Sequence, residues 1–97
     1  MDKRDVIHKL QAHRPELTSR GIESLALFGS LARDEAGSGS DIDLLFEYRR
    51  PFGLFEYARA QRFIESILDD SKVDLVSRAS LLPEIREKIL SEAIRVF

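Results

Sequence analysis

The sequence predicts an α/β (α+β) domain in which helices flank a small mixed β-sheet. The chain has 97 residues, a length that suits a single domain over residues 1–97. Hydrophobic residues make up 43% of the chain, which is enough for one packed core. Apolar segments of strand length alternate with segments of helical periodicity, and this order is typical of a sheet covered by helices.

The first half of the chain contains the first predicted helix and strand. Residues 3–13 carry apolar side chains at helical spacing and are expected to form an amphipathic helix with Asp2 as its N-cap. Pro15 either ends this helix or begins another short turn. Residues 22–28 are mostly apolar and have glycine on both sides, so a buried strand is predicted there. Residues 31–35 have the length of one or two helical turns.

The second half continues the alternation of strand and helix. Polar and apolar side chains alternate over residues 41–48, which predicts a second strand. Residues 54–70 and 81–96 show helical periodicity, and Pro83 suits the first turn of the last helix. Between these two helices, residues 72–76 are expected to form a short third strand. The sheet is therefore predicted to be small.

The composition excludes several classes of function. With no cysteine, the chain has neither a disulfide framework nor a thiolate metal site, and this fits a reducing cytoplasm, the expected location. No apolar run approaches the roughly 20 residues of a membrane helix, so no membrane association is expected. The net charge of −2 gives no general attraction to nucleic acid, and no direct nucleic-acid binding is expected.

The acidic residues are concentrated in one segment. Residues 21–48 hold six acidic residues and one basic residue. Asp41 and Asp43 are two apart on a predicted strand, so their side chains leave the same face, with Cα atoms about 6.5–7 Å apart. Asp74 lies within the third predicted strand and would complete a three-carboxylate site on an adjacent strand. Carboxylates without cysteine or clustered histidine favour Mg²⁺ or Mn²⁺, and hence a phosphate-bearing substrate such as a nucleotide.

A second motif has the character of a phosphate loop. Gly29 and Ser30 follow a predicted strand and open a short helix, where backbone amides can bind an anion. Arg33 lies one turn further on and can reach a phosphate bidentately. Taken singly, each feature has an ordinary structural explanation, because a Gly-Ser turn, solvated strand acids and a solvated helix arginine are all common.

The combined pattern resembles a known family. Gly29-Ser30, ten residues, then Asp41-x-Asp43 is similar to the signature of nucleotidyltransferases of the DNA polymerase β superfamily. The chain as a whole resembles the minimal nucleotidyltransferase (MNT) branch of that superfamily. The segments that carry this resemblance are residues 27–36, 39–45, 73–76, 82–85 and 89–93.

The resemblance implies a polymerase β-like nucleotidyltransferase fold and Mg²⁺-dependent transfer of a nucleoside monophosphate, with two Mg²⁺ ions and ATP as the expected cofactors. The positions that match the family's motif imply that Asp41 and Asp43 bind metal. Asp74 assists metal binding and activates the acceptor hydroxyl. The residues expected to contact the nucleotide are Gly29, Ser30, Arg33 and Ser40.

The resemblance also suggests a partner. Larger members of the superfamily carry a second domain for the acceptor, for which this chain has no room, so the acceptor is expected to belong to another protein. The chain resembles the antitoxin of HEPN–MNT toxin–antitoxin pairs. It is therefore expected to transfer AMP to a tyrosine of a HEPN ribonuclease toxin encoded nearby, as a type VII-like antitoxin able to form an oligomer with its partner. Two alternatives are a non-catalytic module that masks the HEPN partner and a nucleotidyltransferase for a small molecule such as an aminoglycoside.

Overall fold

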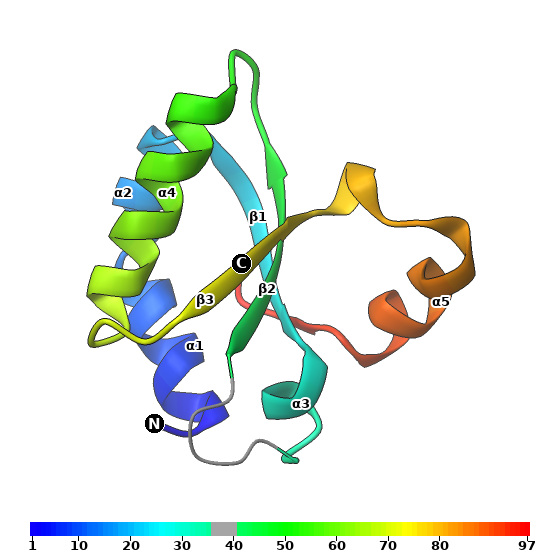
Figure 1. Cartoon of the computed structure of the whole chain (residues 1–97). Helices are drawn as coiled ribbons and strands as arrows, with labels where there is room; N and C mark the ends of the chain where they lie inside the picture. Colours follow the sequence, from blue (N-terminus) through cyan, green and yellow to red (C-terminus); the bar gives the residue numbers. More distant parts are fainter. Residues whose placement is uncertain (36–40) are drawn as a thin grey trace.

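The computed structural model describes residues 1–35 and 41–97 (Figure 1). It confirms the predicted α/β class, with helices around a four-stranded mixed sheet in the order β3-β2-β1-β4. The elements in chain order are α1 (Lys3–Ala12), α2 (Arg14–Ser19), β1 (Ile22–Phe28), α3 (Gly29–Ala32), β2 (Ile42–Tyr48), α4 (Leu54–Ile67), β3 (Val73–Ser77), the 3-10 helix η1 (Arg78–Ser80), α5 (Pro83–Glu92) and β4 (Ile94–Arg95).

The sheet is mixed because its connections differ in length. β1 pairs antiparallel with both β2 and β4. β2 and β3 are parallel, since α4 carries the chain back along the sheet between them. Helices α1, α2 and α4 lie on one side of the sheet, whereas α5 lies on the other (Figure 1). The two faces of the sheet therefore have different surroundings.

The hydrophobic core fills the face under α1, α2 and α4. Ile42, Leu44 and Phe46 on β2 are all buried and belong to it, as the predicted alternation requires. Leu10 of α1 and Ile64 of α4 are fully buried in the same cluster. Burial of each such side chain contributes about 1.5–3 kcal/mol to folding. This face supplies most of the apolar packing of the domain.

The element boundaries follow local signals where these are strong. Asp2 caps α1 by accepting a hydrogen bond from the Asp5 amide at 3.0 Å, as predicted. Pro15 lies in the first turn of a separate helix, α2, which decides between the two alternatives for this residue. The helical turn predicted from residue 31 begins earlier, at Gly29. No helix in the described part of the chain is long and apolar enough to cross a membrane.

The predicted helix over residues 81–96 is wrong at its C-terminal end. Helix α5 ends at Glu92, and Ile94–Arg95 forms a fourth strand beside β1. Val96 and Phe97 then enter the core and are 3% and 6% exposed. The edge of β1 offers unpaired backbone groups, and pairing with them while burying two large side chains outweighs one more helical turn. The helical periodicity of residues 81–96 gives no sign of this pairing, because the edge belongs to β1, which is distant in the sequence.

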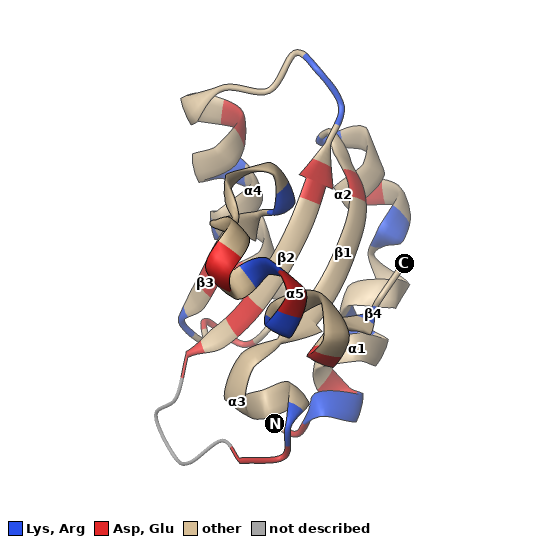
Figure 2. Ribbon diagram, turned by 90° about the vertical axis from the view of Figure 1, so that its right-hand side faces the viewer, with Lys and Arg blue, Asp and Glu red and all other residues tan. Residues whose placement is uncertain are grey.

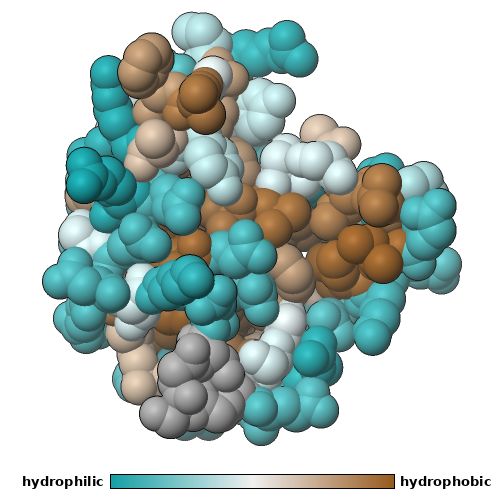
Figure 3. Space-filling view, viewed as in Figure 1, coloured by the Kyte–Doolittle hydropathy of each residue, from teal (hydrophilic) through white to brown (hydrophobic). Residues whose placement is uncertain are grey.

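The packing of α5 is loose. Although its sequence has helical periodicity, no residue of the helix is buried. Leu82, just before the helix, is 62% exposed and Ile85 is 45% exposed. A cavity of about 220 Å³ lies between α5 and the sheet, with Leu45 and Leu90 in its lining. Figure 3 shows apolar side chains gathered on the surface over α5. This helix covers its face of the sheet only in part.

Candidate functional site

The predicted acidic residues come together on the face of the sheet that α5 only partly covers. β2 and β3 pair in parallel with Asp43 directly opposite Asp74. Each lies between residues whose side chains enter the core, so both carboxylates point to the opposite face. Neighbouring strands are about 4.8 Å apart, which makes these side chains immediate neighbours. Asp41 lies one residue before β2 and has the Lys72 ammonium 3.9 Å from its carboxylate.

Negative charge accumulates around Asp43. Partial burial raises the pKa of its carboxyl group, and the charges of Asp74 and Asp41 raise this pKa further. The guanidinium of Arg33 acts in the opposite direction. A cation bound here would relieve the repulsion between the three acids.

The donor set fits a cation that is shared with a substrate. All the candidate ligands are carboxylate oxygens, which suit Mg²⁺ or Mn²⁺. Within residues 1–35 and 41–97, no three His, Cys, Asp or Glu side chains form a group able to hold a metal ion. Mg²⁺ commonly takes one or two carboxylates and completes its shell with water and substrate phosphates. The acids therefore fit Mg²⁺ bound together with a nucleotide rather than a preformed protein cage, and their roles as ligands stay predictions.

Gly29 brings the turn after β1 directly over Asp43. The last residue of β1, Phe28, pairs with Asp43 across the sheet. Gly29 has φ +76°, and a Cβ atom on it would overlap the Asp43 carboxylate. Both its backbone conformation and this close approach require glycine. The Gly-Ser turn and Asp43 are thus adjacent in space.

Ser30 begins the short helix beside this turn. Its side chain is partly buried, and its carbonyl oxygen accepts a hydrogen bond from the Glu35 amide at 2.8 Å. That bond folds the chain after α3 back onto the Gly-Ser turn. Ser40, predicted to contact the nucleotide, lies outside the described residues.

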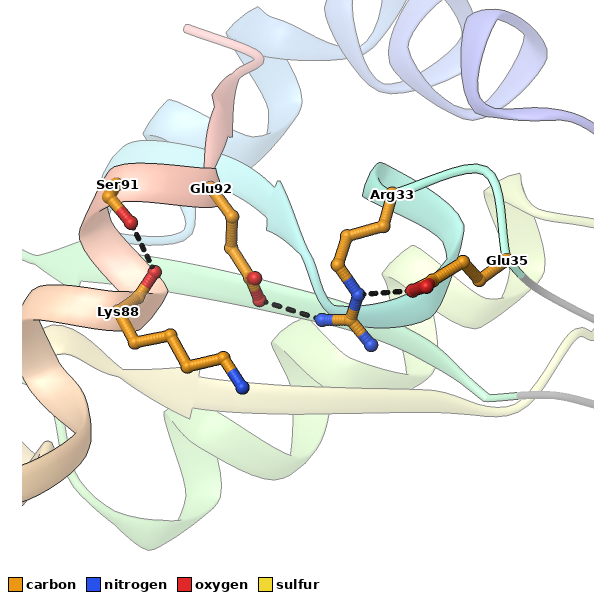
Figure 4. A network of polar contacts seen from close by, with 5 residues as sticks. All are labelled: Arg33, Glu35, Lys88, Ser91 and Glu92. Carbon is orange, nitrogen blue, oxygen red and sulfur yellow. Dashed lines mark hydrogen bonds and ion pairs between the residues drawn. The ribbon is translucent and has the colours of Figure 1, made fainter.

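Arg33 is held by acids from two parts of the chain (Figure 4). Its Nε donates to Glu35 at 2.6 Å, and its Nη1 donates to Glu92 of α5 at 3.0 Å. These hydrogen bonds raise the pKa of Arg33, so it keeps its positive charge. The sequence motif indicated Arg33 but not Glu92. Since the two are 59 residues apart, no local pattern could identify Glu92 as its partner.

Tyr57 is a second residue near the site that the sequence did not indicate. Its hydroxyl donates a hydrogen bond to the carbonyl oxygen of Leu75, the residue after Asp74. Burial raises the pKa of Tyr57, and the charge of Asp74 raises it further. This bond ties α4 to β3 beside the acid. An aromatic residue in the first turns of a helix carries no sequence signal for such a contact.

Comparison with known proteins places this geometry in a family. Residues 10–96 match the family described as nucleotidyltransferase domain. Protein adenylyltransferase MntA of Thermococcus cleftensis is 34% identical over 88 residues, which cover 90% of this chain and 88% of that protein.

Solved structures agree with this assignment. One described as a candidate minimal nucleotidyltransferase is 37% identical, with a TM-score of 0.74, and the match covers 97% of this chain and 95% of that one. A structure of a tri-AMPylated Shewanella oneidensis HEPN toxin in complex with MNT antitoxin has a chain of the same fold. That match is 19% identical, with a TM-score of 0.62, and covers 90% of this chain and 68% of that one. The chain described here therefore belongs to the nucleotidyltransferase domain family.

Proposed function

We propose that this protein transfers AMP from ATP to a hydroxyl group of another protein, with Mg²⁺ bound by its acids. The observation that carries the proposal is the register of β2 and β3, which sets Asp43 beside Asp74 under the Gly29 turn. The similarity to protein adenylyltransferase MntA supports a protein acceptor. The expected acceptor is a tyrosine of a HEPN ribonuclease, and the protein would then act as a type VII-like antitoxin.

The three acids have different roles in the transfer. Asp41 and Asp43 would hold the cation, which would supply positive charge to offset that of the triphosphate and of the leaving pyrophosphate. Asp74 is exposed at the open face, so a hydroxyl arriving from solvent can reach it. Asp74 accepts the proton of that hydroxyl as its oxygen attacks the α-phosphorus in line. The bond to the new oxygen forms as the bond to pyrophosphate breaks.

The turn after β1 and Arg33 position the nucleotide. Gly29 has no side chain, so the turn packs directly against the Asp43 carboxylate and its backbone can approach the phosphates of a nucleotide bound there. The amides at the start of α3 and the Ser30 hydroxyl are donors for phosphate oxygens. Arg33, oriented by Glu35 and Glu92, adds a fixed positive charge. Most of the rate enhancement then comes from positioning and charge stabilisation.

The direct test is adenylyl transfer with a purified partner. The protein is incubated with ATP, Mg²⁺ and the HEPN protein encoded beside it, and the partner is weighed by intact mass spectrometry. We expect a gain of one or more AMP units at a tyrosine. The gain is lost with Asp41→Asn/Asp43→Asn. It is retained with the matched control Asp69→Asn/Asp70→Asn, which removes two exposed acids in the turn after α4.

A second experiment separates catalysis from masking. Cells that express the HEPN partner are tested for rescue by the wild type and by Asp41→Asn/Asp43→Asn. If the variant rescues as well as the wild type and the partner gains no AMP, adenylyl transfer is not the function. Rescue by the wild type alone, with AMP on the partner, supports the proposal.

A further inference from the structure

A pocket of about 360 Å³ lies at the end of the sheet far from the acids. It is formed where β1 begins and β2 ends, whereas the acids lie where β1 ends and β2 begins. Since β1 has seven residues, the two places are about 20 Å apart. Four arginines line the pocket: Arg20, Arg49, Arg50 and Arg59. Figure 2 shows basic residues in the stretch between β2 and α4, at the top of that view.

Tertiary structure brings these arginines together from three segments. The Arg49 amide donates to the Gly21 carbonyl oxygen at 2.8 Å, which joins the end of β2 to the start of β1. The Arg20 guanidinium lies over the ring of Phe63, 4.1 Å from its centroid. The Nη2 of Arg49 donates to the Thr18 carbonyl oxygen at 3.4 Å. Two of the four side chains are thus held in place, which lowers the entropy lost when a ligand binds.

The positive charge in the pocket has little internal compensation. No ion pair between described residues involves any of the four arginines, although Arg33 and Arg78 elsewhere are both paired. The one carboxylate in the lining belongs to Glu56, which accepts a hydrogen bond from the Gly53 amide at 2.7 Å as part of the cap of α4. The lining therefore holds four guanidinium groups and one carboxylate, and a bound anion would offset the excess positive charge.

The shape and chemistry of the pocket indicate the class of anion. Guanidinium groups match phosphate oxygens bidentately, and several converging guanidiniums suit adjacent phosphates. The volume lies within the range of small-molecule sites, and the pocket is concave, unlike a flat protein interface. We propose that this pocket binds the phosphates of a ligand carrying two or more of them, at a site separate from the nucleotide site. The ligand is either a small polyphosphate or the backbone of a nucleic acid, and this role goes beyond adenylyl transfer.

The test uses the whole chain and two phosphate probes. Tripolyphosphate and a short oligouridylate are titrated separately, without divalent cation so that the nucleotide site is weakened. Binding is followed by the ¹H–¹⁵N signals of the arginine Nε–H groups. We expect shifts in the pocket arginines and at least about tenfold weaker binding for Arg50→Gln/Arg59→Gln, since each loses a charged contact. The matched control Arg4→Gln/Arg86→Gln removes two exposed arginines outside the pocket and keeps wild-type affinity.

The two probes identify the source of the phosphate. Binding of tripolyphosphate alone supports a small polyphosphate, and tighter binding of the oligouridylate, with a steep dependence on salt, supports a nucleic-acid backbone. Thermal melting establishes that each variant is folded, and Arg50→Glu provides a second variant if the double one is unstable. The proposal is overturned if neither probe binds, or if the control variant loses as much affinity as the pocket variant. The variant Asp41→Asn/Asp43→Asn should bind both probes with wild-type affinity. Failure of the phosphate pocket can therefore be distinguished from failure of adenylyl transfer.

Discussion

The two faces of the sheet have different roles, although the same strands form both: one packs on the core and the other carries the acids. On the face under α1, α2 and α4, side chains such as Leu44 and Ile64 are fully buried. On the other face, Asp74 is exposed and Asp43 is partly buried, and α5 buries none of its own residues. The buried face can provide the stability that lets the other hold like charges close together. Substitutions on the two faces should therefore affect stability and activity in opposite ways.

The largest expected effect is on activity, at the open face. Asp43→Asn removes a proposed cation ligand and should lower adenylyl transfer at least about 10³-fold, or about 4 kcal/mol in the activation barrier. Turnover of ATP with the partner protein, measured against the wild type, tests this. Less than a tenfold loss would contradict a metal-binding role for this residue.

The same variant should be slightly more stable than the wild type. The folded state raises the pKa of Asp43, so the native protein holds this proton more tightly than the unfolded chain does. The contribution of Asp43 to stability is therefore lost as the pH rises through its folded-state pKa. At neutral pH, Asp43→Asn removes the repulsion, and Tm should rise by up to about 4 °C, less where solvent screens the charges. The gain should vanish below the ordinary pKa of aspartate.

The next effect is on stability, at the buried face. Ile64→Ala leaves a cavity in the core and should lower the free energy of unfolding by about 2–5 kcal/mol. Adenylyl transfer per folded molecule should remain close to the wild-type value. Urea unfolding followed by circular dichroism measures the first quantity, and a loss below about 1 kcal/mol would mean that the core relaxes around the cavity.

A change at the junction of the two faces should affect both properties. Gly29→Ala places a Cβ against the Asp43 carboxylate at a positive φ, and we expect a loss of about 1–3 kcal/mol in stability together with most of the activity. Gly53→Ala is the control, because Gly53 has a negative φ and a Cβ there would approach only the end of the Glu56 side chain, at 3.3 Å. If both variants behave alike, the close approach of Gly29 to Asp43 has no special role.

The smallest effect is expected on α5. Ile85→Ala changes the same residue type as Ile64→Ala, but Ile85 is 45% exposed. We expect a loss within about 0.5 kcal/mol, typical of surface positions. Parallel unfolding curves of the two variants provide the comparison. Equal losses would show that α5 packs on the sheet as tightly as α4.

Local patterns were sufficient for the elements that pack on the core. Strand β1 has the predicted bounds, and the alternation along β2 correctly separates Ile42, Leu44 and Phe46 from Asp43. These predictions succeed because a strand buried on one side imposes a period of two on its own sequence. Strand geometry applies to Asp43 but not to Asp41, because β2 begins at Ile42 and Asp41 lies one residue before it.

Longer-range features depended on which segments meet in space. The edge of β1 determines where α5 ends and where the fourth strand forms. The sequence of residues 93–97 alone contains no sign of this edge. The Glu92 contact with Arg33 is another such case. In each one the partner is far away in the sequence, and its backbone or charge decides the local conformation.

The sequence alone thus determined the class of fold, the core-facing periodicity and the acids of the candidate site, because these depend on residues a few positions apart. Tertiary structure decided that Asp43 faces Asp74 across two parallel strands, and that Gly29 closes over Asp43. It also gathered the arginine pocket from three separate segments. Register, edge pairing and charge clustering are properties of contacts between distant segments, and they exist only once the chain has folded.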